Sequence, residues 1–206
     1  MVKKADIPRH LVDAALAAAA ERGWRTLSLS DIAAEAKLPL AKVYPVFRSK
    51  QAILDALVRQ IDERVLAGQP AAWDDADTPR DRLFDVLMRR FDALAPYKAG
   101  LARVLRDTGL DPVARLCAAP RLTRSMAWML EAAGIDSHGP AGALRTQGLA
   151  LLWFGAMRVW LADDSPDMAK TMAALDARLR RADRCAATFT DRPRRAAREE
   201  PAEDAG

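Results

Sequence analysis

Side chains that donate hydrogen bonds or carry positive charge gather in segment 28–50 of this 206-residue chain. Lys42, Tyr44 and Arg48 lie together in one short part of it. Side chains of these kinds bind the phosphate oxygens and base edges of nucleic acids. Residues 1–50 hold nine Lys and Arg against five Asp and Glu, whereas the rest of the chain is balanced. This distribution favours a nucleic-acid-binding segment, and an ordinary solvated surface is the alternative.

The segment that contains these side chains has the sequence pattern of a helix-turn-helix. Ser28 followed by Asp31 is a capping box, which predicts the start of one helix. Pro39 breaks that helix and suits the first turn of a second helix over 40–47. Ser49 is placed to cap a third, longer helix. Two short helices, a tight turn and a supporting long helix make a helix-turn-helix unit.

Pro45 lies inside the expected second helix and should shorten it. Within a helix, a proline loses one hydrogen bond and clashes with the carbonyl four residues back, at a cost of about 3 kcal/mol. We therefore expect this helix to be short, to be kinked or to end near Val43. Most of its side chains cannot hydrogen-bond to a base, which leaves Lys42, with Lys37 and Arg48 as alternatives.

The same segment resembles the DNA-binding signature of TetR-type repressors, in order and spacing, over residues 8–67 without a gap. The matching positions are Ile32, Ala33, Ala36, Leu38, Tyr44, Phe47, Ser49 and Lys50. The resemblance implies that the second short helix enters the major groove of DNA. It also implies that Tyr44 and Lys50 hold phosphates.

The chain departs from that family pattern in the turn and the second helix. Lys37 stands where the family usually has glycine, and Pro39 where it has serine or threonine. Ala41, Lys42 and Pro45 stand at the usual glycine, threonine and histidine positions. Residue chemistry and resemblance together give one predicted DNA-binding set: Ser28, Lys37, Leu40, Lys42, Tyr44, Arg48 and Lys50.

Beyond this head, proline and glycine divide the chain into a series of expected helices. Residues 68–78 form a polar linker, after which Thr78 and Asp81 repeat the capping-box pattern. Pro112 and Pro120 are each expected to begin a helix. The expected architecture is all-α and TetR-like, with a three-helix helix-turn-helix DNA-binding head (1–50), a helical ligand-binding and dimerisation body (51–189) and a disordered tail (190–206).

The most hydrophobic helix is expected over 142–161 and is apolar nearly all round. Such a helix is buried in the body or in a dimer interface. Large apolar side chains on several helices suit a pocket for a hydrophobic molecule, and simple core packing is the alternative. The resemblance favours the pocket, because TetR-like bodies hold effectors between such helices. The predicted ligand-binding residues are Phe84, Met88, Phe91, Met126, Met129, Trp153, Met157 and Trp160.

The last helix is expected to begin at Ser165 and to end near Phe189, with an apolar seam and a second half rich in arginine. Core or dimer packing explains this pattern, and the alternative is peripheral contact with an anionic membrane. Segment 160–183 also resembles the C-terminal end of lipid-binding ubiquinone-biosynthesis accessory proteins, which are similar to TetR repressors in fold. That resemblance supports a rival function, the binding of a lipid or isoprenoid without DNA readout.

No hydrolase or nucleotide-binding motif occurs in the sequence. His10 and His138 lie far apart, and neither Cys117 nor Cys185 has a partner at metal-ligand spacing. We therefore expect no enzymatic activity, no metal and no cofactor. Two separate cysteines favour a reducing cytoplasm, and neither a long apolar run nor a signal peptide is found.

These observations together predict a TetR-type DNA-binding transcriptional regulator that acts as a repressor. Its expected partners are a double-stranded DNA operator, a second copy of the chain and a hydrophobic small-molecule effector.

Overall fold

The computed structural model describes residues 6–70, 72–74, 76–108 and 112–196, excluding the side chains of 112–118 and 185–196. Within this part of the chain the regular structure is helical and contains no strand, which confirms the predicted all-α class. The helices are α1 (Ile7–Arg22), α2 (Leu29–Glu35), α3 (Leu40–Val43), α4 (Lys50–Ala67), α5 (Pro79–Leu94), the 3-10 turn η2 (Ala95–Tyr97), α6 (Lys98–Thr108), α7 (Pro112–Ala132), α8 (Gly139–Leu161) and α9 (Ala169–Ala196). The chain forms two compact units, and the boundary between them lies between Leu151 and Leu152.

Side-chain caps fix the starts of the helices in the head. The Ser28 hydroxyl accepts the backbone N–H of Asp31 at 3.1 Å, and the Asp31 carboxylate accepts the N–H of Ser28 at 2.8 Å. The predicted capping box at α2 is therefore confirmed. In the same way, the Ser49 hydroxyl accepts the N–H of Ala52 at 3.1 Å and begins α4.

Two prolines have opposite effects on helix length. Pro45 ends the second head helix, so that α3 stops at Val43, as expected from the proline, and does not extend over 40–47. The reason is that proline has no N–H for the carbonyl of Ala41. Pro120 was expected to begin a new helix, and that prediction is wrong because α7 runs through it. Packing of α7 against α4 and α5 outweighs the local cost of the proline.

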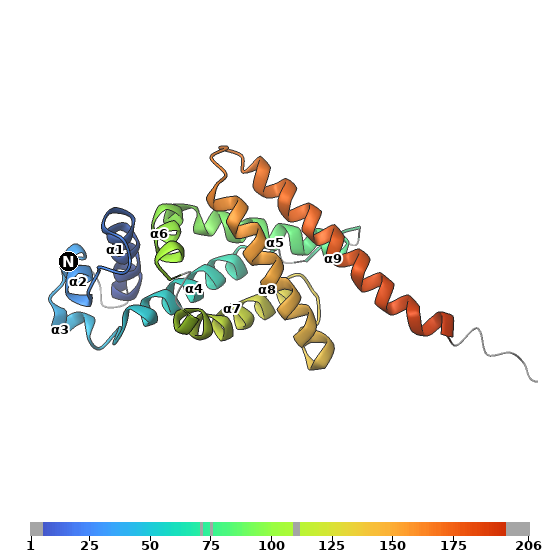
Figure 1. Ribbon diagram of the computed structural model, residues 1–206, viewed down its shortest axis with the longest axis horizontal. Coiled ribbons are helices and arrows are strands. Elements are labelled where there is room, and N and C mark those ends of the chain that lie inside the picture. The colour runs from blue at the N-terminus through green and yellow to red at the C-terminus, as the bar shows by residue number, and fades with distance from the viewer. Residues whose placement is uncertain (1–5, 71, 75, 109–111, 197–206) are drawn as a thin grey trace, which may run out of the picture. The chain divides into compact units, whose positions relative to one another are not determined.

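In the first unit, α4 leaves the head and runs beside α5 and α7, while α1 packs on both α4 and α6 (Figure 1). The core residues on these helices include Leu11, Ile53, Ile61 and Leu87, all of which are fully buried. The helices α1 and α6 approach closely at Gly100. A Cβ atom added to Gly100 would lie 2.3 Å from the carbonyl oxygen of Leu16. This contact requires glycine at position 100.

The second unit contains the end of α8, a loop and α9. Asp163 organises the loop, because its carboxylate accepts the N–H and hydroxyl of Thr171 at 2.8 and 2.7 Å, and also those of Ser165. α9 begins at Ala169, four residues after the expected start, and continues to Ala196 rather than ending near residue 189. The rest of the expected tail lies outside the described residues. Among the described residues, no helix combines the length and apolar character needed to cross a membrane.

Candidate nucleic-acid interface

The turn between α2 and α3 is built on a left-handed residue. Lys37 has φ +54°, its N–H bonds to the carbonyl of Ala34 at 3.0 Å, and the N–H of Leu38 bonds to the carbonyl of Ala33 at 2.9 Å. These two bonds form a Schellman cap, which normally uses glycine at the left-handed position. The lysine therefore stands in a conformation that suits glycine, and its side chain is exposed beside α3.

The outer face of α3 is mainly apolar. Val43 is fully buried and anchors the helix, whereas Leu40 keeps 50% of its surface exposed. Ala41 and Lys42 are exposed as well. This short helix therefore offers one cationic side chain and two apolar ones to a binding partner.

Tyr44 and Arg48 lie together just after α3. Tyr44 is 66% exposed, and the Arg48 guanidinium carbon is 5.8 Å from the centre of its ring. An arginine over an aromatic face is attracted to the ring and held in place by it. The pair places a hydroxyl group and a guanidinium at one point of the surface, where both can bind phosphate.

Lys50 is bound within the head. Its ammonium group donates to the carbonyl of Trp24 at 2.9 Å and lies 5.3 Å from the centre of the Trp24 ring. Burial lowers the pKa of Lys50, and Asp107 and Asp31 oppose that effect. The structure thus shows that Lys50 joins the start of α4 to the loop before α2. Its predicted role at phosphate stays a prediction.

Two further side chains of the head have contacts that explain its geometry. The Ser28 hydroxyl is held by Asp31, whose pKa is lowered mainly by that hydroxyl group. His10 donates from Nε2 to the carbonyl of Ala36 at 2.9 Å. This bond ties α1 to the end of α2, 26 residues later, and no local sequence signal reveals it.

The predicted ligand-binding residues are divided between the two units. Phe91, Met126 and Met129 are fully buried in the first unit, on α5 and α7. Phe84 and Met88, also on α5, keep partial exposure. The remaining three lie on the part of α8 that belongs to the second unit. Trp153 and Trp160 are buried there, and Met157 is half-buried. The first three are core residues, and the role of all eight in ligand binding stays a prediction.

Two cavities in the first unit have other linings, and within the described residues neither includes a member of the predicted ligand set. One of about 500 Å³ lies between α4 and α7 and is lined by Trp128 and by charged residues that include Asp55, Arg59 and Arg121. Arg121 forms an ion pair with Asp55 at 2.6 Å. The other, of about 410 Å³, lies among α1, α4, η2 and α6. Both cavities border α4.

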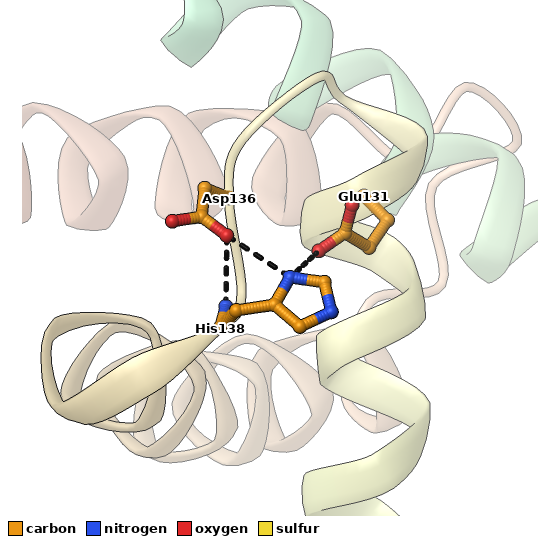
Figure 2. A group of neighbouring side chains, drawn as sticks. All are labelled: Glu131, Asp136 and His138. Carbon is orange, nitrogen blue, oxygen red and sulfur yellow. Dashed lines mark hydrogen bonds and ion pairs between the residues drawn. The ribbon is translucent and has the colours of Figure 1, made fainter.

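Three potential metal ligands meet where α7 joins α8 (Figure 2). His138 Nδ1 lies 3.0 Å from Asp136 and 3.5 Å from Glu131. Neither paired histidines nor cysteines at ligand spacing mark this group in the sequence. All three side chains are exposed. Each carboxylate already accepts a backbone N–H of the loop, from Ser137 or His138, so we assign the cluster to closure of the loop.

Comparison with known proteins agrees with the helix-turn-helix geometry of the head. Residues 11–57 match the family model described as bacterial regulatory proteins, tetR family. A TetR transcriptional regulator from Nitrosomonas europaea is 24% identical, with 86% of this chain and 98% of that one covered, at a TM-score of 0.70. A TetR transcriptional regulator from Rhodococcus sp. RHA1 is 23% identical, with the same coverage and a TM-score of 0.60. A search of the curated proteins finds no match.

The head, with its capped α2, its left-handed turn and its exposed α3, is a helix-turn-helix DNA-binding domain. The tetR family model matches the head, and the chain shares the fold of solved TetR regulators.

Proposed function

We propose that the chain is a dimeric repressor whose affinity for a DNA operator is controlled by a small molecule bound in its body. The observation on which this rests is the exposed surface formed by α3 and the Tyr44–Arg48 pair in a head of the TetR family. Lys42 would face base edges, while Tyr44, Arg48 and Lys50 would bind phosphates. Ser28 and Lys37, which lie on either side of α2, would add contacts to the sugar-phosphate backbone of the DNA.

The dimer part of the proposal is supported by an apolar stripe on α8. Leu144 and Leu151 are 74% and 75% exposed, and Phe154 is 49% exposed. Their spacing of seven and three residues places them on one side of the helix. Large apolar side chains gathered in this way mark interaction surfaces. A second copy that covers the stripe would pair two heads, which then meet major grooves about 34 Å apart.

The effector part of the proposal depends on α4. This helix begins directly after the head and borders both described cavities. A ligand that binds the body better in one position of α4 shifts the population toward that position, and so changes the separation of the heads. The proposed ligand is a hydrophobic small molecule.

The lipid-binding alternative is not favoured. The matched family model and the similar structures are those of transcriptional regulators, and no membrane contact is supported by them.

Titration of labelled duplexes from the DNA upstream of the protein's own gene tests the proposal. Arg48→Ala should weaken binding to all sequences and reduce the slope of log affinity against log salt by about one. Arg48 suits this test better than Lys50, because Lys50 also holds the carbonyl of Trp24. Lys170→Ala removes an exposed cation of α9 and serves as the matched control. Failure of the wild-type protein to bind any such duplex at low salt would contradict the proposal.

A further inference from the structure

The outer face of α3 has a defined order of side chains around the helix. Successive residues of a helix are about 100° apart, so the buried Val43 fixes which direction points inward. Ala41 then points most directly outward. Leu40 flanks it on one side and Lys42 on the other.

This order places apolar atoms at the centre of the surface that faces a partner. Leu40 is half exposed although it is a large apolar residue, and no neighbouring helix of the head covers its outer half. Of the four residues of α3, all of which the structure describes, only Lys42 has a side chain that donates hydrogen bonds. Hydrogen-bond readout by this helix is therefore limited to one long, flexible cation.

One base presents an apolar group in the major groove. Thymine has a C5-methyl group there, and small or branched apolar side chains bind it by contact. Exposed cations lie on α3 and close to it in the chain, since Lys37 precedes the helix, Lys42 belongs to it and Arg48 follows it. Positive charge around an apolar centre matches the major groove of DNA, in which phosphates border the base edges.

We propose that Leu40 and Ala41 recognise thymine methyl groups in each half of the operator. This inference rests on the proposed function, because it requires α3 to enter the major groove. It makes Leu40 a specificity-determining residue and predicts that the operator has thymine at fixed positions under α3. Lys42 adds a hydrogen bond to a neighbouring base edge.

The test begins with selection of duplexes from a random DNA library by the full-length protein at low salt. Each thymidine of the enriched half-site is then replaced by deoxyuridine, which removes only the methyl group and keeps the hydrogen-bonding pattern. Affinity should fall about fourfold for each methyl group that α3 contacts, the effect expected from exposing one buried methyl to water. Uracil placed outside the half-sites is the control and should change nothing.

Variants assign the contact to a side chain. Leu40→Ala should bind the thymine duplex more weakly and lose most of the penalty for uracil at the contacted position. Lys42→Ala should keep that penalty in full. Because Leu40 is half exposed, the alanine variant should fold, and the uracil scan on the wild-type protein does not depend on it.

The outcomes separate the two proposals. An enriched duplex that tolerates uracil at every half-site position would overturn the inference about thymine and leave the proposed function standing. A uracil penalty of the same size in Leu40→Ala and the wild-type protein would also overturn it. If no duplex is enriched, the proposed function fails, and this inference fails with it.

Discussion

The backbone N–H of Arg25 donates a hydrogen bond to the carboxylate of Asp107 at 3.0 Å, and the Arg25 guanidinium donates to the Asp107 carbonyl at 3.1 Å. The bond from the Arg25 N–H is the main cause that lowers the pKa of Asp107. The two bonds together join the loop before α2 to the end of α6. The crossing of Gly100 and Leu16 joins α1 to the same helix. The head therefore touches α6 at two places in addition to its covalent link through α4.

Gly100→Ala should destabilise the protein by about 1–3 kcal/mol, the usual cost of forcing a methyl group into a packed interface. The added Cβ would lie 2.3 Å from a backbone oxygen of α1, which cannot move without the helix. Gly68→Ala is the matched control, since its Cβ would meet only ordinary contacts at 3.5 Å or more. Urea unfolding of the two variants makes the comparison, and equal stability would contradict the tight crossing.

Lys37→Gly should stabilise the head by about 1 kcal/mol, because glycine occupies the left-handed region without the steric penalty of other residues. Lys37→Ala keeps a Cβ at the same position and should show no such gain. The measurement is the free energy of unfolding without DNA. A glycine variant no more stable than the alanine variant would show that the left-handed turn is wrong.

Asp62→Ala should destabilise the protein by about 3–5 kcal/mol. The Asp62 carboxylate on α4 binds the guanidinium of Arg90, which is 3% exposed, and accepts the hydroxyl of Ser125 at 2.7 Å. Removing this carboxylate leaves the buried guanidinium of Arg90 without the negative charge of Asp62. The double variant Asp62→Ala/Arg90→Met should be more stable than Asp62→Ala alone. A larger loss in the double variant would mean that the ion pair is not the cause.

Asp163→Asn should lower the midpoint temperature of thermal unfolding at neutral pH. It should also make that temperature change less as the pH is lowered. Hydrogen bonds from Ser165 and Thr171 hold the pKa of Asp163 far below its ordinary value of 3.8. The carboxylate therefore stabilises the folded state fully above that value, and the contribution is lost as the pH falls below it. Thermal unfolding at a series of acid pH values checks this, with the exposed neighbour Asp164→Asn as control. Parallel pH profiles for wild type and Asp163→Asn would refute the assignment.

Leu151→Asp should dissociate the proposed dimer. A carboxylate buried in an apolar interface without a partner costs several kcal/mol, which corresponds to at least about a 100-fold weaker association. Sedimentation at several protein concentrations measures the effect. Leu40→Asp, a similar change at an exposed leucine of the head, should leave the dimer intact. Wild-type protein that sediments as a monomer at every concentration would contradict the dimer itself.

Local signals in the sequence predict much of this fold. Ser28 and Thr78 begin helices as expected, because each side chain accepts the N–H of an aspartate only three residues away. Pro45 ends α3 for an equally local reason. The local signal of Pro120 gave a wrong prediction, since the packing that carries α7 through it comes from helices distant in sequence.

The details of the candidate site were harder to predict for the same reason. The identity of the head follows from Tyr44, Phe47 and their neighbours, which form one continuous pattern. The anchoring of Lys50 by the Trp24 carbonyl joins residues 26 positions apart, and the bond from Arg25 to Asp107 joins residues 82 apart. Contacts of this length depend on the angles between helices, which the sequence pattern does not encode.

The bare backbone at Gly100 has a consequence for building hybrid sensors. A foreign head recombined at residue 50 would bring its own first helix, and that helix would have to fit against α6 at the distance that Leu16 allows. Exchange of the whole head therefore risks a poor fit between its first helix and α6. Transplanting only residues 29–43 would leave the contact between α1 and α6 native.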